Sequence, residues 1–128
     1  MKIIGLGIDL VETARIQSAL EKHGTHFLER VFTPGEIAHC SPKRNPHPHY
    51  AARFAAKEAV GKALGTGIGA GISWQDIEVH SLPSGQPAIR LHGKALEIAT
   101  ALGADSILLS LTHTDVSAAA SALALGSP

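Results

Sequence analysis

Residues 50–64, YAARFAAKEAVGKAL, decide the fold because they form the longest helical pattern in the chain. The stretch is rich in alanine, the strongest helix former, and its charged side chains recur four residues apart. Gly65 follows and is expected to end the helix, since glycine adopts helix-closing conformations at little cost. The glycine-rich residues 65–71 predict a loop. They do not form a phosphate-binding P-loop, because no Gly-Lys pair of the chain is followed by Ser or Thr.

Strand patterns lie on both sides of this helix. Residues 2–11, KIIGLGIDLV, are rich in Ile and Leu and predict a buried first strand. A helix over residues 13–23 and short helical segments are expected next, the last of them starting with the capping box TPGE at residues 33–36. Beyond the long helix, the patterns predict a hairpin, a helix and two strands over residues 77–82, 88–92, 94–102, 107–112 and 116–125. The order β-α-α-α-β-β-α-β-β describes an α+β fold in one domain, residues 1–128.

Composition narrows the class of protein. A chain of 128 residues fits one domain, and 45% hydrophobic against 17% charged residues excludes disorder. The 11 basic and 11 acidic residues balance, which argues against a non-specific nucleic-acid binder. No apolar run approaches the ~18 residues of a membrane helix. The single cysteine, Cys40, excludes an internal disulfide and favours a reducing compartment, so we expect a cytoplasmic protein.

Asp9, Glu58 and Lys62 are the candidates for chemistry. Asp9 lies near the end of an apolar strand, where a carboxylate must be paired, hydrogen-bonded or bound to a metal, or else serve the following helix N-terminus. Glu58 and Lys62 are four residues apart and share a helix face, as a surface ion pair also would. Two carboxylates from separate elements and a lysine suit a magnesium–phosphate site, because Mg²⁺ takes one or two protein carboxylates and completes its shell with water and phosphate oxygens.

Other basic residues have two interpretations each. Arg53 and Lys57 lie on another side of the long helix, where they extend into water unless an anion lies nearby. His113 follows the apolar run ILLSLT and is either a turn histidine or a functional residue at a strand end. His47 and His49 flank a proline, which does not make a preorganised metal site.

Four segments, in this order, resemble the bacterial holo-acyl-carrier-protein synthases, which are small trimeric 4′-phosphopantetheinyl transferases. They are GIDLVE (7–12), FTPGE (32–36), RFAAKEAVGKALGTG (53–67) and SLTHT (110–114). The resemblance covers essentially the whole chain. It implies a single-domain 4′-phosphopantetheinyl transferase-like fold and transfer of 4′-phosphopantetheine from coenzyme A to a serine of apo acyl carrier protein. Adenosine 3′,5′-bisphosphate is released, and the reaction supports fatty acid biosynthesis.

The resemblance also implies roles for particular residues. Asp9 and Glu58 match the magnesium-binding carboxylates, and Lys62 matches the lysine near the reacting phosphates. The coenzyme A site would include Arg53, Lys62, Gly65 and His113. The carrier protein would dock on the first helix at Arg15 and Lys22, although Glu12 and Glu21 dilute the basic face there. The proton of the carrier serine could pass to Glu58 or to a water held by the metal.

Assembly and two alternative functions complete the expectations. The last strand, residues 116–125, carries no charge on either face, so both faces are expected to be covered, one of them by a neighbouring subunit. A homotrimer with sites at subunit interfaces fits the resemblance. One alternative is a non-catalytic oligomeric module that binds coenzyme A or an acidic protein. The other keeps the enzyme but assigns it a polyketide or peptide carrier domain.

Overall fold

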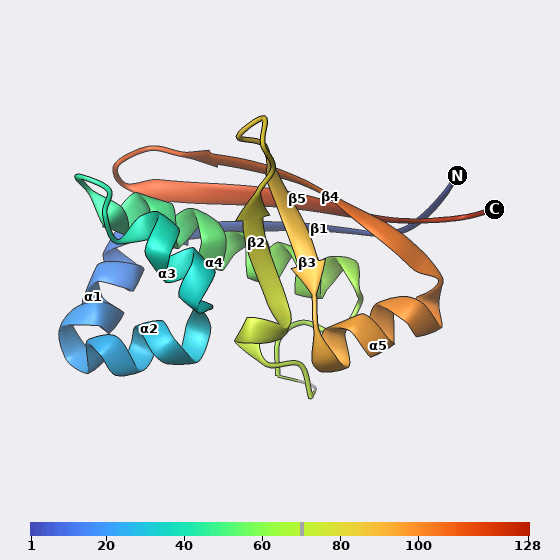
Figure 1. Ribbon diagram of the computed structural model, residues 1–128, viewed down its shortest axis with the longest axis horizontal. Helices are drawn as coiled ribbons and strands as arrows, with labels where there is room; N and C mark the ends of the chain where they lie inside the picture. The colour runs from blue at the N-terminus through green and yellow to red at the C-terminus, as the bar shows by residue number, and fades with distance from the viewer. Residues whose placement is uncertain (70) are drawn as a thin grey trace.

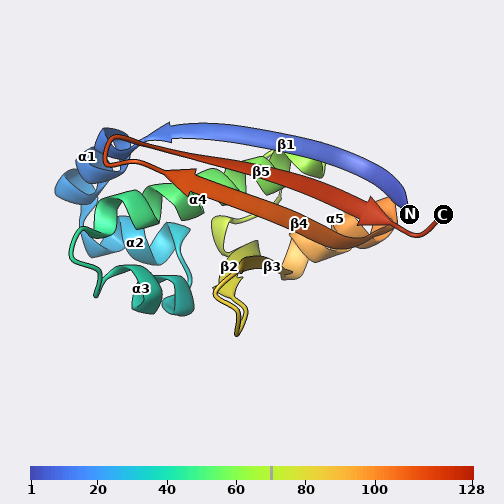
Figure 2. The same cartoon turned by 90° about the horizontal axis from the view of Figure 1, so that it is seen from above.

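A three-stranded antiparallel sheet and one long helix organise the molecule. The computed structural model describes residues 1–69 and 71–128. Strands β1 (Lys2–Glu12), β4 (Ala104–His113) and β5 (Ser117–Gly126) form the sheet in the order β1-β5-β4. Helix α4 (Pro46–Ala63) runs along one face of this sheet, and both chain ends lie at the same end of it (Figures 1 and 2). Among the described residues, no helix or strand covers the opposite face of the sheet (Figure 2).

Shorter elements complete the fold. Three helices gather at one end of the molecule (Figure 1): α1 (Thr13–His23), α2 (Thr25–Val31) and α3 (Pro34–Cys40). Between α4 and β4, the described residues form a one-turn 3-10 helix (Trp74–Asp76), the hairpin strands β2 (Ile77–Ser81) and β3 (Pro87–Leu91), and helix α5 (Gly93–Leu102). The expected α+β class and order are confirmed, and the helical stretch before α4 divides because Phe32 and Thr33 are extended. No helix in the described part of the chain has the length and apolar character that a membrane crossing requires.

Helix α4 forms the centre of the core. Its residues Ala55, Ala56 and Ala59 are fully buried. The facing strand β5 presents an alternating row of alanines, residues 118–124, that are equally hidden. Small side chains on both surfaces allow the helix and the sheet to pack closely.

Two glycines bring the edge strand β1 directly onto α4. A Cβ atom placed on Gly5 would lie 1.9 Å from the carbonyl oxygen of Ala63, and one on Gly7 would lie 1.8 Å from that of Ala59. No side chain larger than hydrogen fits either position, so the backbone of β1 rests against the backbone of the helix. Asp9 follows two residues later on the same face of the strand, because strand side chains alternate. The glycines therefore carry Asp9 to the surface of α4.

A buried ion pair joins α4 to the elements on its other side. The Lys57 ammonium lies 2.8 Å from Glu36 Oε1, and neither side chain has exposed surface. Lys57 also donates to the carbonyl oxygens of Trp74, at 3.0 Å, and Ile77, at 2.6 Å. All three ammonium protons thus have acceptors, as a buried charge requires. Of the two interpretations of Lys57, extension into water is wrong, because an anion, the Glu36 carboxylate, lies beside it.

The two faces of β5 have different surroundings. The face with Ala120 packs on α4, so the sheet itself needs no neighbour there. The opposite face of the sheet stays apolar and open, with Leu6, Ile8 and Leu10 of β1 each about two-thirds exposed, at 69%, 68% and 71%. Both faces of β5 were expected to be covered, one of them by a neighbouring subunit. Within this chain, only the face toward α4 is covered. An exposed apolar area of this kind marks an interaction surface.

Candidate active site

Asp9 and Lys62 meet where β1 crosses α4. Lys62 Nζ lies 3.0 Å from Asp9 Oδ1 and donates to the carbonyl oxygen of Ile8 at 2.9 Å. Lys62 is half exposed, whereas the Asp9 side chain is only 16% exposed. The helix partner expected for Lys62 was Glu58, but the ion pair in the structure is with the strand. The lysine ammonium is therefore held at the edge of the site by two oxygen atoms of β1.

Glu58 faces the same place from α4. Burial raises the pKa of its carboxyl group, and the negative charge of Asp9 raises it further, while Arg15 and Lys62 lower it. Two carboxylates that destabilise each other's charge favour a cation between them. In residues 1–69 and 71–128, no cluster of three or more His, Cys, Asp or Glu side chains could enclose a metal. Two carboxylates beside an open surface nevertheless fit Mg²⁺, which takes its remaining oxygens from water and phosphate.

An apolar groove adjoins this site on the side of α1. The Arg15 guanidinium lies over the ring of Phe54, 5.0 Å from its centroid, and Phe54 stacks on Trp74 with centroids 4.7 Å apart. The groove has a volume of about 360 Å³ and is lined by Arg15, Ile16, Ala19, Phe27, Phe54 and Trp74, among others. The second expected docking residue, Lys22, is exposed near the end of the same helix. An apolar groove beside a cation suits a partner that presents both an apolar side chain and a carboxylate.

Arg53 lies on a different side of α4. Five residues separate it from Glu58, which is about 140° around the helix. Its side chain is 6% exposed, and its Nε atom is buried without a hydrogen-bond partner in the described residues. It lines a cavity of about 240 Å³ between α3, α4 and the β2-β3 hairpin, with Gly35, His39, Glu78, His80 and Arg90. Of the two interpretations of Arg53, extension into water is wrong.

His113 joins the Arg53 side rather than the Asp9 side. Its ring contacts the ring of His49, with centroids 5.0 Å apart and an interplanar angle of 64°. His49 precedes Arg53 by one helical turn on α4, so the two share a face. Gly65 closes α4 beyond Lys62, at φ 82°, and its N–H donates to the Lys62 carbonyl oxygen at 2.9 Å. The structure thus brings Asp9, Glu58 and Lys62 together at one place and Arg53 and His113 at another. Gly65 lies at the end of α4 and is hydrogen-bonded to the Lys62 backbone.

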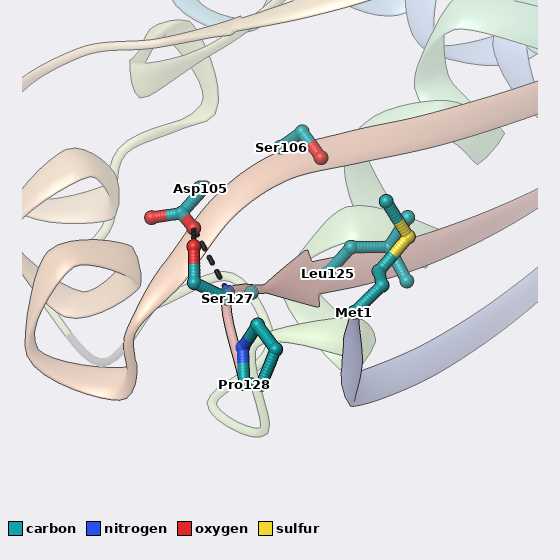
Figure 3. A pocket seen from close by; sticks show the side chains of 7 residues that line it. Met1, Asp105, Ser106, Leu125, Ser127 and Pro128 are labelled. Carbon is teal, nitrogen blue, oxygen red and sulfur yellow. Dashed lines mark hydrogen bonds between the residues drawn. The ribbon is translucent and has the colours of Figure 1, made fainter.

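Three features of the site were not predicted from the sequence: His39, His49 and the Phe54–Trp74 stack. A signal existed for His49, because it lies four residues before Arg53 on the predicted helix face. A further hollow lies at the chain ends (Figure 3), where Asp105 accepts hydrogen bonds from the Ser127 N–H at 2.9 Å and its hydroxyl at 2.7 Å. None of the candidate site residues lines that hollow, so we assign it no chemistry.

Residues 5–120 match the family model of the 4′-phosphopantetheinyl transferase superfamily. The chain belongs to this superfamily. A holo-[acyl-carrier-protein] synthase of Solibacter usitatus is 52% identical over 112 residues, which are 88% of this chain and 90% of that protein. One from Koribacter versatilis is 46% identical over 121 residues, 94% of this chain and 97% of that protein.

Solved structures of the superfamily have the same fold. The holo-[acyl-carrier-protein] synthase of Neisseria meningitidis superimposes with a TM-score of 0.87 at 33% identity, covering 97% of this chain and 99% of that one. The Helicobacter pylori enzyme, solved in complex with coenzyme A, gives a TM-score of 0.83 at 34% identity and covers 94% and 99%. Because the superfamily match spans residues 5–120, we interpret the Asp9–Glu58–Lys62 cluster as a site of this superfamily.

Proposed function

We propose that the protein is a holo-[acyl-carrier-protein] synthase, which transfers 4′-phosphopantetheine from coenzyme A to a serine of apo acyl carrier protein in a magnesium-dependent reaction. The observation that carries this proposal is the meeting of Asp9, Glu58 and Lys62 in a member of this superfamily. The relatives' names supply the substrate pair. We assign the activity to residues 1–128 as one domain, in the cytoplasm, in support of fatty acid biosynthesis.

The chemistry requires alignment and charge neutralisation more than covalent help. The serine oxygen attacks the pantetheine-side phosphorus, a new O–P bond forms, and the bond to the leaving adenosine 3′,5′-bisphosphate breaks. Asp9 and Glu58 would hold Mg²⁺, which when bound supplies positive charge to the pyrophosphate. Lys62, fixed by the Asp9 carboxylate and the Ile8 carbonyl, presents its charge to the same phosphates. The serine proton would pass to Glu58 or to a water beside it.

We assign Arg53 and His113 to a different part of coenzyme A. Their side of α4 is not the side of Asp9, Glu58 and Lys62, so they do not serve the reacting pyrophosphate in the same chain. The remaining phosphate of coenzyme A is the 3′-phosphomonoester. It suits the buried Arg53 guanidinium, whose Nε–H has no acceptor in the described residues. Each chain would thus carry two half-sites, the Asp9–Glu58–Lys62 group and the Arg53–His113 group. When copies associate, the first half-site of one copy would meet the second half-site of its neighbour. The exposed apolar face of the sheet supports such an association as a closed trimer.

We expect the substitution Ser121→Arg to break this assembly. Ser121 lies on the open sheet face, opposite Ile8 in one neighbouring strand and Ser110 in the other. An arginine there would bury a charge in an apolar interface, so sedimentation should detect a monomer with less than about a tenth of the wild-type activity. Ala120 is unsuitable for this test, because its side chain points at α4. Ala101→Arg, on an exposed position of α5, is the matched control; a Ser121→Arg monomer with full activity would contradict shared sites.

We expect the carrier protein to dock at Arg15 and the adjoining groove. Arg15→Glu should raise the KM for the carrier by about tenfold and leave the KM for coenzyme A nearly unchanged. The KM for the carrier should also rise with salt, because surface charges are screened within about 8 Å at physiological ionic strength. Lys22→Glu should act in the same direction and Lys94→Glu, on α5, should not. A carrier KM that is independent of salt would count against this docking face.

Mass spectrometry of the carrier tests the function directly. Apo acyl carrier protein incubated with coenzyme A, Mg²⁺ and this protein should gain the mass of one phosphopantetheine, with adenosine 3′,5′-bisphosphate as the second product. Coenzyme A binding without transfer would instead support the non-catalytic binding module. Transfer to polyketide or peptide carriers, but not to the fatty-acid carrier, would change the partner while keeping the reaction.

A further inference from the structure

His49 stands in a group of basic side chains that come from four parts of the chain. His39 comes from α3, Lys43 from the segment after it, Arg53 from α4 and His113 from the end of β4. The ring of His49 contacts His113 and lies one helical turn before Arg53. These elements pack together at the N-terminal part of α4. Five basic groups therefore surround one region of the surface.

Basic groups dominate the charge around His49, whereas Glu78 lines the Arg53 cavity on the side of the hairpin. Burial lowers the pKa of His49, and His113, Lys43 and Arg53 lower it further in that order. Burial also lowers the pKa of His39, again with Arg53, Lys43 and His49 contributing. Among the residues that the structure describes, no carboxylate acts on either imidazole. Asp115, the acidic residue next to His113 along the chain, is exposed on the β4-β5 turn and does not shift the His49 pKa.

A second observation points to an anion at this place. Arg53 is more than nine-tenths buried, yet its Nε–H has no acceptor in the described chain. A buried donor without an acceptor costs roughly 1–3 kcal/mol, and a charged one costs more. A bound oxyanion would satisfy that donor and offset the surrounding positive charge.

We infer that His49 is a further coenzyme A residue, which binds the 3′-phosphomonoester together with Arg53 and His113 and takes up a proton when the phosphate binds. The inference rests on the proposed function, because it takes coenzyme A as the ligand. It adds a residue to the site and a pH dependence to the binding step. His47, two residues earlier, faces another side of the helix and has no part in it.

The direction of the pH effect on coenzyme A binding follows from the coupling between phosphate binding and protonation of His49. In the free protein, burial first and then the charges of His113, Lys43 and Arg53 lower the His49 pKa, which favours the neutral imidazole. A phosphate dianion beside the ring favours the charged imidazolium and raises that pKa in the complex. Binding therefore consumes a proton over the interval between the two pKa values, and affinity increases as the pH falls through it.

Calorimetric titration of the intact protein with coenzyme A tests this. At pH 6, His49→Gln should bind coenzyme A about fivefold more weakly than the wild type, and at pH 8 the two should bind equally. The binding enthalpy at pH 7, compared in two buffers of different ionisation enthalpy, should reveal proton uptake by the wild type and less by the variant. Dephospho-coenzyme A, which lacks the 3′-phosphate, should show neither the His49 effect nor this uptake.

The control is His47→Gln, which repeats the substitution on the same helix and should match the wild type at both pH values. Wild-type binding that His49→Gln does not weaken at pH 6 overturns the inference and leaves the proposed function intact. An equal loss at pH 6 and pH 8 also overturns it, because a packing defect has no pH dependence of this kind. Failure of the wild-type protein to bind coenzyme A at any pH overturns the proposed function as well.

Discussion

Replacing Glu58 by glutamine is expected to lower kcat for phosphopantetheine transfer by about a thousandfold or more. The amide keeps the size of the side chain but cannot hold a divalent cation as a carboxylate does, nor accept the serine proton. The same variant should be at least as stable as the wild type at pH 7. Burial and Asp9 raise the Glu58 pKa, which means that the ionised carboxylate is disfavoured in the folded state and that its removal relieves a cost.

Steady-state kinetics and thermal unfolding on one preparation measure both effects. Asp9→Asn should produce a comparable loss of kcat, because it removes the second carboxylate and the ion pair that holds Lys62. Glu12→Gln is the matched control, since Glu12 lies exposed at the end of the same strand. Near-normal activity of Glu58→Gln at low magnesium would remove this residue from the proposed metal site.

Gly7→Ala should destabilise the protein by about 3 kcal/mol or more, the largest effect we expect from a single methyl group. The added Cβ would lie 1.8 Å from the Ala59 carbonyl oxygen, a backbone atom that cannot rotate away. Strand β1 would have to move off the helix, which would expose core surface and displace Asp9. For a domain of this size the midpoint of thermal unfolding should fall by about 10 °C or more.

Gly35→Ala provides the contrast, because it adds the same methyl group where there is room. Its Cβ would have Glu78 Oε2 as nearest neighbour at 3.4 Å, and Gly35 lies in helix α3, where alanine is the better helix former. That variant should unfold within about 1 kcal/mol of the wild type, on the stable side. Equal unfolding midpoints for Gly7→Ala and the wild type would show that β1 can separate from α4 without loss.

The sequence predicted the type and order of the helices and strands. The main difference concerns where α4 begins, and it has a physical reason. The long helix was expected from residue 50, yet α4 begins at Pro46. Proline is a poor residue inside a helix because it has no N–H to donate. Pro46 and Pro48 both lie in the first turn, where the N–H groups have no helical partner, so nothing is lost there.

The candidate site could be predicted in its residue types but not in its pairings. Helical spacing places Glu58 and Lys62 on one face and Arg53 on another, as the structure has them. It gives no sign that Lys62 pairs with Asp9, because that contact depends on how closely the glycines of β1 let the strand approach. The spacing of residues along one helix carries no information about a contact with a residue more than fifty positions away.

Lys57 was misread for a related reason. Spacing alone does not say which elements cover a helix face, and α3 and the start of β2 cover the face of Lys57. The capping box predicted only one of the two hydrogen bonds that the Glu36 carboxylate accepts from backbone N–H groups. Its Oε1 accepts from the Thr33 N–H, as the box requires, but Oε2 accepts from the Val79 N–H, forty-three positions away. A helix whose lysine is surrounded by alanine and phenylalanine was the available signal of burial.

The strand order β1-β5-β4 sets when the enzyme can become active during its synthesis. Strand β1 leaves the ribosome first of all the elements, but its only partner in the described sheet is β5, which leaves last. At about 5–20 residues per second, β1 waits for several seconds without a strand to pair with. Asp9 acquires its place beside the helix only when β1 docks, so a nascent chain that lacks β5 has an incomplete catalytic centre. Folding of this sheet therefore waits until β5 has been synthesised, and the Asp9 side of the candidate site is complete only from that point on.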